Sequence, residues 1–214
     1  MPSGKAAGLD AVTIDAFGTL VELDDPAGRL RTALGERGVE REREHVAAAF
    51  AAEVEYYLVH KVEGADPASL ADLRRRCSAV FLEGAEADLD PEEFAPAFVE
   101  ALVFRPLEGV PEALAALRAA GLALACVTNW DVGVSEQLVR AGLAHLLTTV
   151  VSSAEVGAEK PDPRVFTEAL ARLGVRPERA LHVGDGDADL AGARAAGLAF
   201  AEAPLATLPT RLGL

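Results

Sequence analysis

The sequence predicts an α/β protein whose doubly wound parallel sheet is interrupted by an all-helical insertion. Short apolar runs alternate with amphipathic helical patterns over residues 104–214, as in chains built from parallel βαβ units. One more apolar run lies near the N-terminus, and only helical patterns fill the stretch between residues 25 and 105. These two observations indicate one sheet whose first strand is separated from the others by inserted helices.

Five segments are expected to form the strands. Residues 11–15 (AVTID) are apolar and β-branched, and the run ends in an aspartate before a turn with Gly18. This pattern is typical of a buried parallel strand that enters a loop. Four later runs have the same character: residues 122–128, 146–151, 180–184 and 198–202.

Helical patterns separate these strands. Residues 110–121 (VPEALAALRAAG) begin with a proline near the first turn and end in a glycine, the arrangement that starts and stops a helix. Similar patterns cover residues 135–142, 163–174 and 189–197. Strands that alternate with helices in this way form a parallel, Rossmann-like sheet.

The insertion contains four helical segments: residues 28–38, 43–59, 69–84 and 91–102. It interrupts the sheet between its first and second strands, so we expect a separate bundle above the carboxyl edge, where open α/β sheets bind ligands. The predicted domains are therefore an α/β core of residues 1–22 and 104–214 and a helical cap of residues 23–103.

The composition disfavours several classes of function. The chain has 20 Lys and Arg against 34 Asp and Glu, a net charge of −14, which argues against nucleic acid or an anionic membrane as a partner. No run approaches about 18 uncharged apolar residues, and residues 1–10 lack the apolar core of a signal peptide. Cys77 and Cys126 form no metal-binding or disulfide pattern. We expect a cytoplasmic monomer or homodimer that acts on a small anionic substrate.

Polar residues follow four of the predicted strands, near the point where each strand ends. They are Asp15, Thr128 with Asn129, Lys160, and Asp185 with Asp189. Because the carboxyl ends of parallel strands meet at one edge of a sheet, we expect these side chains to converge on a single site.

This set of side chains matches the needs of phosphoryl transfer. It offers a carboxylate nucleophile, a hydroxyl and an amide for substrate oxygens, and a lysine that neutralises developing negative charge. The remaining carboxylates suit a hard divalent cation, and Mg²⁺ prefers oxygen ligands of this kind. We expect Asp15 and Asp185 as ligands of Mg²⁺, with Asp189 behind a bound water. Zinc would favour His or Cys.

Four motifs carry a resemblance to a known family. In chain order they are DAFGTL (15–20), VTNWD (127–131), KPDPRVF (160–166) and HVGDGDADLAGARAAG (182–197), and they resemble the four motifs of the haloacid dehalogenase superfamily. The insertion directly after the first motif is similar to that superfamily's helical cap of the first type. The resemblance implies a Mg²⁺-dependent phosphatase that acts on a small phosphorylated metabolite through an aspartyl-phosphate intermediate.

The resemblance also implies a role for each motif residue. Asp15 would attack the substrate and bind Mg²⁺ through its other oxygen, and Lys160 would pair with Asp15 and the substrate charge. Thr128 would bind the transferred group through its hydroxyl, with help from Asn129. The remaining metal contacts would come from Asp185, from Asp189 through a water, and from the main-chain carbonyl of Phe17.

Phe17 is also where the chain departs from the phosphatase pattern. Most phosphatases of the superfamily carry an aspartate there as general acid and base, and a phenylalanine cannot transfer a proton. General acid–base help is worth about 10²–10⁴ in rate, so we expect activated esters to be better substrates than alkyl phosphates. Asp131 or a cap residue is an alternative proton donor.

The same departure leaves two other hypotheses open. The 2-haloacid dehalogenases have a tyrosine at this position and work without metal through an ester on the nucleophile, here Asp15. Three features speak against that activity: the acidic run GDGDAD (184–189), Phe166 in place of a tyrosine, and the absence of arginine from residues 47–52. The second hypothesis is a weakly catalytic or non-catalytic protein that binds an anionic ligand.

Some aromatic and basic residues allow two interpretations. Residues 55–62 (EYYLVHKV) line the substrate pocket, or Tyr56, Leu58 and Val59 pack within the cap while His60 and Lys61 are solvated. Packing is the simpler interpretation. Strand alternation turns His182 away from the site. Trp130 either forms a wall of the site or packs in the core.

Overall fold

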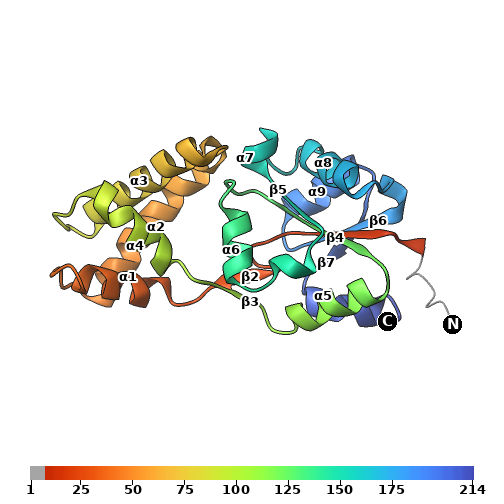
Figure 1. Cartoon of the computed structure of the whole chain (residues 1–214), viewed down its shortest axis with the longest axis horizontal. Helices are drawn as coiled ribbons and strands as arrows, with labels where there is room; N and C mark the ends of the chain where they lie inside the picture. Colours follow the sequence, from red (N-terminus) through yellow and green to blue (C-terminus); the bar gives the residue numbers. More distant parts are fainter. Residues whose placement is uncertain (1–7) are drawn as a thin grey trace.

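A computed structural model describes residues 8–214 of the chain, and Figure 1 shows its two parts, an α/β sheet domain and a bundle of helices. Residues 1–7, which include most of the segment judged to lack a signal-peptide core and the start of the predicted core domain, lie outside the described residues. Among the residues that are described, no helix is long and apolar enough to cross a membrane.

The sheet has five strands, all paired in parallel, in the order β5-β4-β1-β6-β7. Their bounds are β1 Ala11–Ile14, β4 Ala123–Thr128, β5 Thr149–Ser152, β6 Ala180–Gly184 and β7 Ala199–Glu202. These are the five predicted strands, so the predicted fold class is confirmed. The third begins three residues later than expected, because residues 144–146 form a 3₁₀ turn.

Helices cover both faces of the sheet, as a doubly wound fold requires. On one face the core contains side chains of α5 (Val110–Ala119), α6 (Val134–Arg140) and α10 (Leu208–Arg211). On the other face it contains side chains of α8 (Arg164–Leu173) and α9 (Asp187–Ala195). A short helix, α7 (Ser153–Val156), follows β5. Strand β1, at the centre, is buried along its whole length.

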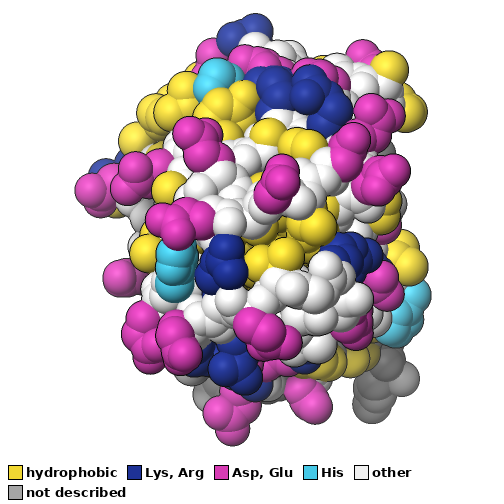
Figure 2. Space-filling view, turned by 90° about the vertical axis from the view of Figure 1, so that its left-hand side faces the viewer, with side chains coloured by type: hydrophobic (Ala, Val, Ile, Leu, Met, Phe, Trp, Pro, Cys, Tyr) yellow, Lys and Arg dark blue, Asp and Glu magenta, His cyan; other side chains and the backbone are white. Residues whose placement is uncertain are grey.

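The four inserted helices have a hydrophobic core of their own. They are α1 Pro26–Gly35, α2 Arg43–His60, α3 Pro67–Gly84 and α4 Pro91–Ala101. Phe81 lies at the centre of this core, with its ring centroid 6.0 Å from that of Phe94 and 5.3 Å from that of Phe98. On the face of the bundle in Figure 2, acidic side chains are spread among basic ones, with hydrophobic groups between them.

A small antiparallel ladder lies where the chain leaves and re-enters the sheet domain. Strand β2 (Val21–Leu23) pairs with β3 (Phe104–Pro106), and Figure 1 shows both beside the links to the bundle. The expectation of no strand between residues 25 and 105 was wrong at Phe104 and Arg105. Each strand has three residues, too few to show a period, and its partner lies about 80 residues away.

Candidate active site

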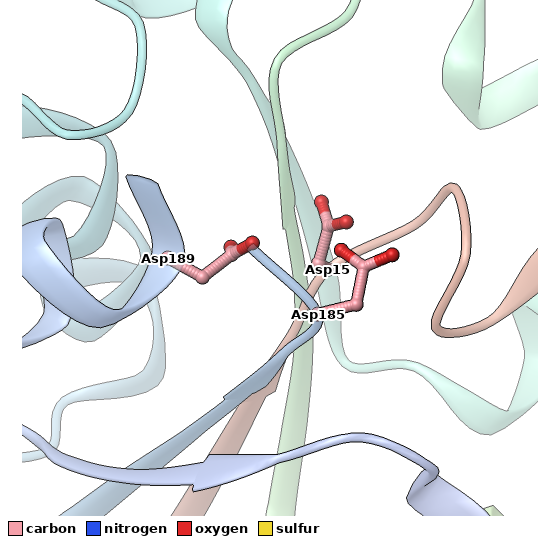
Figure 3. A group of neighbouring side chains, drawn as sticks. All are labelled: Asp15, Asp185 and Asp189. Atoms are coloured by element: carbon pink, nitrogen blue, oxygen red, sulfur yellow. The ribbon is translucent and has the colours of Figure 1, made fainter. Parts of the chain in front are cut away.

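Three aspartates meet at the carboxyl edge of the sheet. Asp15 directly follows β1, Asp185 directly follows β6, and Asp189 lies in the first turn of α9. One carboxylate oxygen from each lies within 4.8 Å of the others, and Figure 3 shows the three side chains around one point. Asp15 and Asp189 are buried, whereas Asp185 is exposed.

Lys160 links two of these carboxylates. Its buried Nζ donates to Asp15 Oδ1 at 2.5 Å and to Asp189 Oδ1 at 2.6 Å, and also to the carbonyl of Val127 at 3.2 Å. Burial acts to lower the pKa of Lys160, but the two carboxylates raise it above its ordinary value, so the ammonium stays charged. One cation among three carboxyl groups leaves an excess of negative charge at the site.

The two buried aspartates differ in pKa because their surroundings differ. Burial raises the pKa of Asp15, and Lys160 opposes this effect only in part. Burial also acts to raise the pKa of Asp189, but its hydrogen bonds with His182 and Lys160 hold it below its ordinary value. Asp189 therefore stays ionised between two donors, and a further cation near Asp15 would favour the ionised form there too.

His182 contacts this group of side chains, so the expectation that it turns away was wrong. Its Nε2 lies 2.8 Å from Asp189 Oδ1, and its Nδ1 lies 2.9 Å from Thr13 Oγ1. Alternation places the ring on the sheet face covered by α9, and the first turn of that helix brings Asp189 onto the same face. Burial lowers the pKa of His182, so the ring is neutral, donating from Nε2 and accepting at Nδ1.

Thr128 and Asn129 lie at the end of β4, next to the aspartates. Thr128 is buried, in register with Ser152 of β5. The side chain of Asn129 binds the main chain of Lys160, with Oδ1 accepting from its N–H at 2.7 Å and Nδ2 donating to its carbonyl at 3.1 Å. Asn129 thereby fixes the loop that carries Lys160 in front of Asp15.

The loop after β1 leaves space for Asp185. Gly18 has φ +80°, and a Cβ at this position would lie 2.1 Å from Asp185 Oδ2. Only glycine therefore lets the carboxylate approach the loop so closely. The acidic group presents oxygen atoms alone, around an excess of negative charge, and this donor set fits a hard cation such as Mg²⁺.

A mostly apolar cavity of about 230 Å³ lies between the helix bundle and the loops that follow β1 and β4. Phe17 and Asn129, the neighbours of the site in sequence, form part of its wall. Phe17 is 52% exposed. Much of the remaining wall comes from the bundle, with Phe50, Tyr57, Leu58, Phe98 and Leu102 among its residues.

The structure corrects the simpler interpretation of residues 55–62. Leu58 and Val59 are 55% and 72% exposed, so they are not a packing face, and Leu58 lines the cavity. Lys61, expected in solvent, is buried, and its Nζ lies 2.8 Å from Glu159 Oε2. This ion pair joins the bundle to the loop before Lys160, a contact that helical periodicity within α2 does not reveal. Tyr56 does pack against the core of the bundle.

Asp131 and Trp130 connect the second motif to the bundle. Tyr57 donates from its hydroxyl to Asp131 Oδ2 at 2.8 Å, and the N–H of Gly133 donates to Oδ1 at 2.7 Å. Burial raises the pKa of Asp131, and these hydrogen bonds counteract it only in part. Trp130 both packs edge-on against Phe104 and lines the cavity. Neither the Tyr57 contact nor a buried acid at Glu53 in the cavity wall was expected from the sequence.

The chain is similar in sequence to known hydrolases. The model of the haloacid dehalogenase-like hydrolases matches residues 9–197. A glyceraldehyde 3-phosphate phosphatase of Methanopyrus kandleri is 41% identical over 119 residues, which are 52% of this chain and 51% of that protein. The chain thus spans about half the length of this relative.

Two other similarities extend over most of the chain. A phosphoglycolate phosphatase of Nitrosospira multiformis is 33% identical over 196 residues, covering 88% of this chain and 80% of that protein. The structure of a 2-haloacid dehalogenase from Pseudomonas syringae superposes with a TM-score of 0.66 at 26% identity, covering 96% of this chain and 98% of that one. The chain is therefore similar over most of its length to proteins named for either activity.

Proposed function

The chain belongs to the haloacid dehalogenase-like hydrolase family, and we propose that it is a Mg²⁺-dependent phosphatase of small phosphate monoesters. The observation that carries this proposal is the group of Asp15, Asp185 and Asp189 around Lys160. A site with three carboxylates and one lysine has an excess of negative charge, and a divalent cation would balance it. The relatives named as phosphatases support the same conclusion.

In this proposal Asp15 is the nucleophile. Its free oxygen attacks phosphorus, and the bond to the leaving oxygen breaks as the aspartyl-phosphate forms; water then hydrolyses that ester and frees Asp15. Lys160 neutralises charge on Asp15 and on the phosphate, and Thr128 binds a phosphate oxygen through its hydroxyl. Asn129 contributes at the phosphate side by holding Lys160 in place.

The cation would be held by Asp15, by Asp185 and by the main-chain carbonyl of Phe17, with Asp189 binding one of its waters. Bound Mg²⁺ would neutralise charge on the phosphate and favour the ionised form of Asp15. His182 helps to hold Asp189 in place, because its Nε2 and the Nζ of Lys160 both contact Asp189 Oδ1.

The proposed domains are a core of residues 1–22 and 104–214 and a cap of residues 23–103. The separate core of the helix bundle and the β2–β3 ladder at its two links support this division. The cavity under the bundle supports a cap that opens for the substrate and closes over it to exclude water. A cytoplasmic location forms part of the proposal and agrees with two free, buried cysteines.

A 2-haloacid dehalogenase activity is the second candidate. Phe17 is the observation that favours it, because displacement of halide from carbon needs no proton donor at that position, and an apolar cavity beside Phe17 would suit such a substrate. In this reaction Asp15 would form a carbon ester and would need no metal. The exposed Asp185 beside Asp15 favours the phosphatase, because an ester on carbon gives it no role.

One experiment separates the two activities. Hydrolysis of p-nitrophenyl phosphate with and without Mg²⁺ is measured beside chloride release from L-2-chloropropionate, using wild type, Asp15→Asn and Asp187→Asn. Asp187 is exposed on the first turn of α9 and is not part of the acidic group, so this variant controls for loss of a nearby charge. The phosphatase requires Mg²⁺-dependent phosphate release that Asp15→Asn abolishes and Asp187→Asn retains. Chloride release without metal would instead establish the dehalogenase.

A further inference from the structure

The cavity beside the site differs in character from the site itself. The acidic group is polar and charged, whereas the cavity wall contains the side chains of Phe50, Val54, Phe98 and Leu102. Its volume of about 230 Å³ is more than a benzene-sized group needs, since a cavity of about 150 Å³ is large enough for benzene. An organic group of that size therefore fits beside the phosphate site.

The cavity lies where a leaving group must lie. Phe17 and Asn129 belong to its wall, Phe17 two residues after the proposed nucleophile Asp15 and Asn129 directly after Thr128. Phe17 also occupies the position from which a proton donor would act on the leaving oxygen. A phosphate monoester anchored at Asp15 and Lys160 thus places its organic part against Phe17 and into the cavity.

The charged side chains in the wall do not suit an anionic group. Of the described residues that line the cavity, Arg74 alone is cationic, and its Nη2 pairs with Glu136 Oε2 at 3.0 Å. The other two charged residues are acids, Glu53 and Asp131, and both are buried. A carboxylate in this cavity would find no free cation among the described residues of the wall, and burying an unpaired charge is costly.

Two uncharged polar atoms of the wall, Gln137 Oε1 and the hydroxyl oxygen of Tyr57, offer no free donor to a carboxylate. Gln137 Oε1 is buried and has no hydrogen-bond partner among residues 8–214. This oxygen only accepts hydrogen bonds, so it cannot bind a carboxylate, which also only accepts. The hydroxyl of Tyr57 already donates to Asp131.

We propose that this cavity receives the leaving group of the phosphate monoester and that this group is apolar and carries no negative charge. The inference rests on the proposed phosphatase function and narrows its substrate class. It separates this chain from enzymes whose leaving group bears a carboxylate, as glycolate does. The substrates that fit this cavity are therefore phosphate esters of small apolar, uncharged alcohols, and among them the activated esters, such as aryl phosphates, depend least on a proton donor at Phe17.

A pair of phosphonates tests the proposal by binding alone. n-Butylphosphonate and 3-phosphonopropionate have nearly the same size and the same phosphonate anchor, but only the second carries a carboxylate. Trp130 is the single tryptophan of the chain and lines the cavity, so its fluorescence reports binding there in the presence of Mg²⁺. We expect n-butylphosphonate to bind at least about tenfold more tightly, because the carboxylate would be buried without a partner. Equal affinities, or tighter binding of 3-phosphonopropionate, would overturn the proposal.

Two variants of one helix locate the effect in the cavity. Leu58→Lys places a positive charge in the wall, while Val59→Lys changes an exposed neighbour that does not line the cavity. Because the added ammonium would pair with the carboxylate of 3-phosphonopropionate, the preference for n-butylphosphonate should fall by about tenfold in Leu58→Lys and stay unchanged in Val59→Lys. If the two variants retain the preference equally, the cavity is not where the apolar group binds.

These titrations need no turnover, so they are distinct from the test of the phosphatase function. If the phosphatase proposal is wrong, p-nitrophenyl phosphate is not hydrolysed, and this result does not depend on the phosphonate affinities. Conversely, an active, Asp15-dependent enzyme that prefers 3-phosphonopropionate would keep the phosphatase proposal and remove the apolar leaving group.

Discussion

Phe17 determines which leaving groups the proposed enzyme can release. Its side chain borders the cavity beside Asp15 and cannot donate a proton to the leaving oxygen. We expect Phe17→Asp to raise kcat on n-butyl phosphate by about 10², the low end of general acid catalysis, with a much smaller gain on p-nitrophenyl phosphate, whose leaving group needs no proton. Phe17→Leu controls for loss of the ring. A gain of equal size on both esters would contradict a missing proton donor.

His182 is a positioning residue in this site. It shares Asp189 Oδ1 with Lys160, so His182→Ala should loosen Asp189 and weaken Mg²⁺ binding by about tenfold, the usual effect of removing an outer partner of a metal site. In His182→Gln the amide can still donate to Asp189 and should restore most of the affinity. Activity measured against Mg²⁺ concentration checks this. An unchanged Mg²⁺ midpoint in His182→Ala would remove the residue from this role.

The sequence predicts the position of side chains that directly follow a strand. It does not predict contacts between side chains of separate elements. Asp15 and Asp185 end neighbouring parallel strands, so topology alone brings them together. The contact of His182 with Asp189 depends on how α9 packs over β6, and the bond of Tyr57 to Asp131 depends on how the cap docks. No local pattern contains either orientation.

The loop after β1 combines a positive φ with a close side-chain contact at Gly18. Gly18→Ala would place a methyl group 2.1 Å from the present position of Asp185 Oδ2, so Asp185 must move. We expect weaker Mg²⁺ binding together with a loss of about 1 kcal/mol for alanine at positive φ. Gly121→Ala is the matched control, because its φ is +83° and nothing lies within 4 Å of the added Cβ. Thermal unfolding should shift similarly in both variants, and only Gly18→Ala should change the Mg²⁺ titration; equal titrations would contradict the steric argument.

The elements that the sequence predicts well have local start and stop signals. Asp66 and Asp90 cap α3 and α4 by accepting from main-chain N–H groups of the first turn, each just before a proline. Gly174 ends α8 in the left-handed conformation. Strands β2 and β3 have no such signals, since they are stabilised by pairing across the whole insertion.

The molecule as a whole is joined by few polar contacts between bundle and sheet domain. Tyr57 binds Asp131, and the N–H of Val132 donates to the carbonyl of Gly64 at 3.0 Å. Lys61 pairs with Glu159, Arg74 pairs with Glu136, and Arg140 donates to the carbonyl of Glu100 at 3.3 Å. Each of the two parts has its own hydrophobic core. A cap held by a small number of polar contacts can open without disturbing either core, as the proposed function requires.

Two groups of carboxyls make the stability depend on pH in opposite directions. Exposed acids such as Asp66 and Asp72 have lowered pKa values, because they accept hydrogen bonds from a helix N-terminus or from arginines. Their contribution is lost as the pH falls below about 4. Three buried acids, Asp15, Asp131 and Glu53, have raised pKa values, because burial disfavours the charged form, and the pKa of Glu53 reaches about 7. In their protonated form these acids do not weaken the fold, but this contribution to stability is lost as the pH rises above about 4.5. The free energy of unfolding should therefore be greatest near pH 5.

Glu53 should account for much of the decline above pH 5. Between its ordinary pKa and about 7 the folded chain holds a proton that the unfolded chain releases, so stability falls through this range and is level above it. A shift of this size corresponds to about 3 kcal/mol. Urea denaturation at pH 5 and pH 8 should therefore show a smaller difference in Glu53→Gln than in wild type, with the variant the more stable at pH 8. Glu55→Gln, an exposed change on the same helix, should leave the difference as it is. If Glu53→Gln changes the free energy of unfolding by the same amount at pH 5 and at pH 8, the carboxyl of Glu53 does not gain a proton on folding.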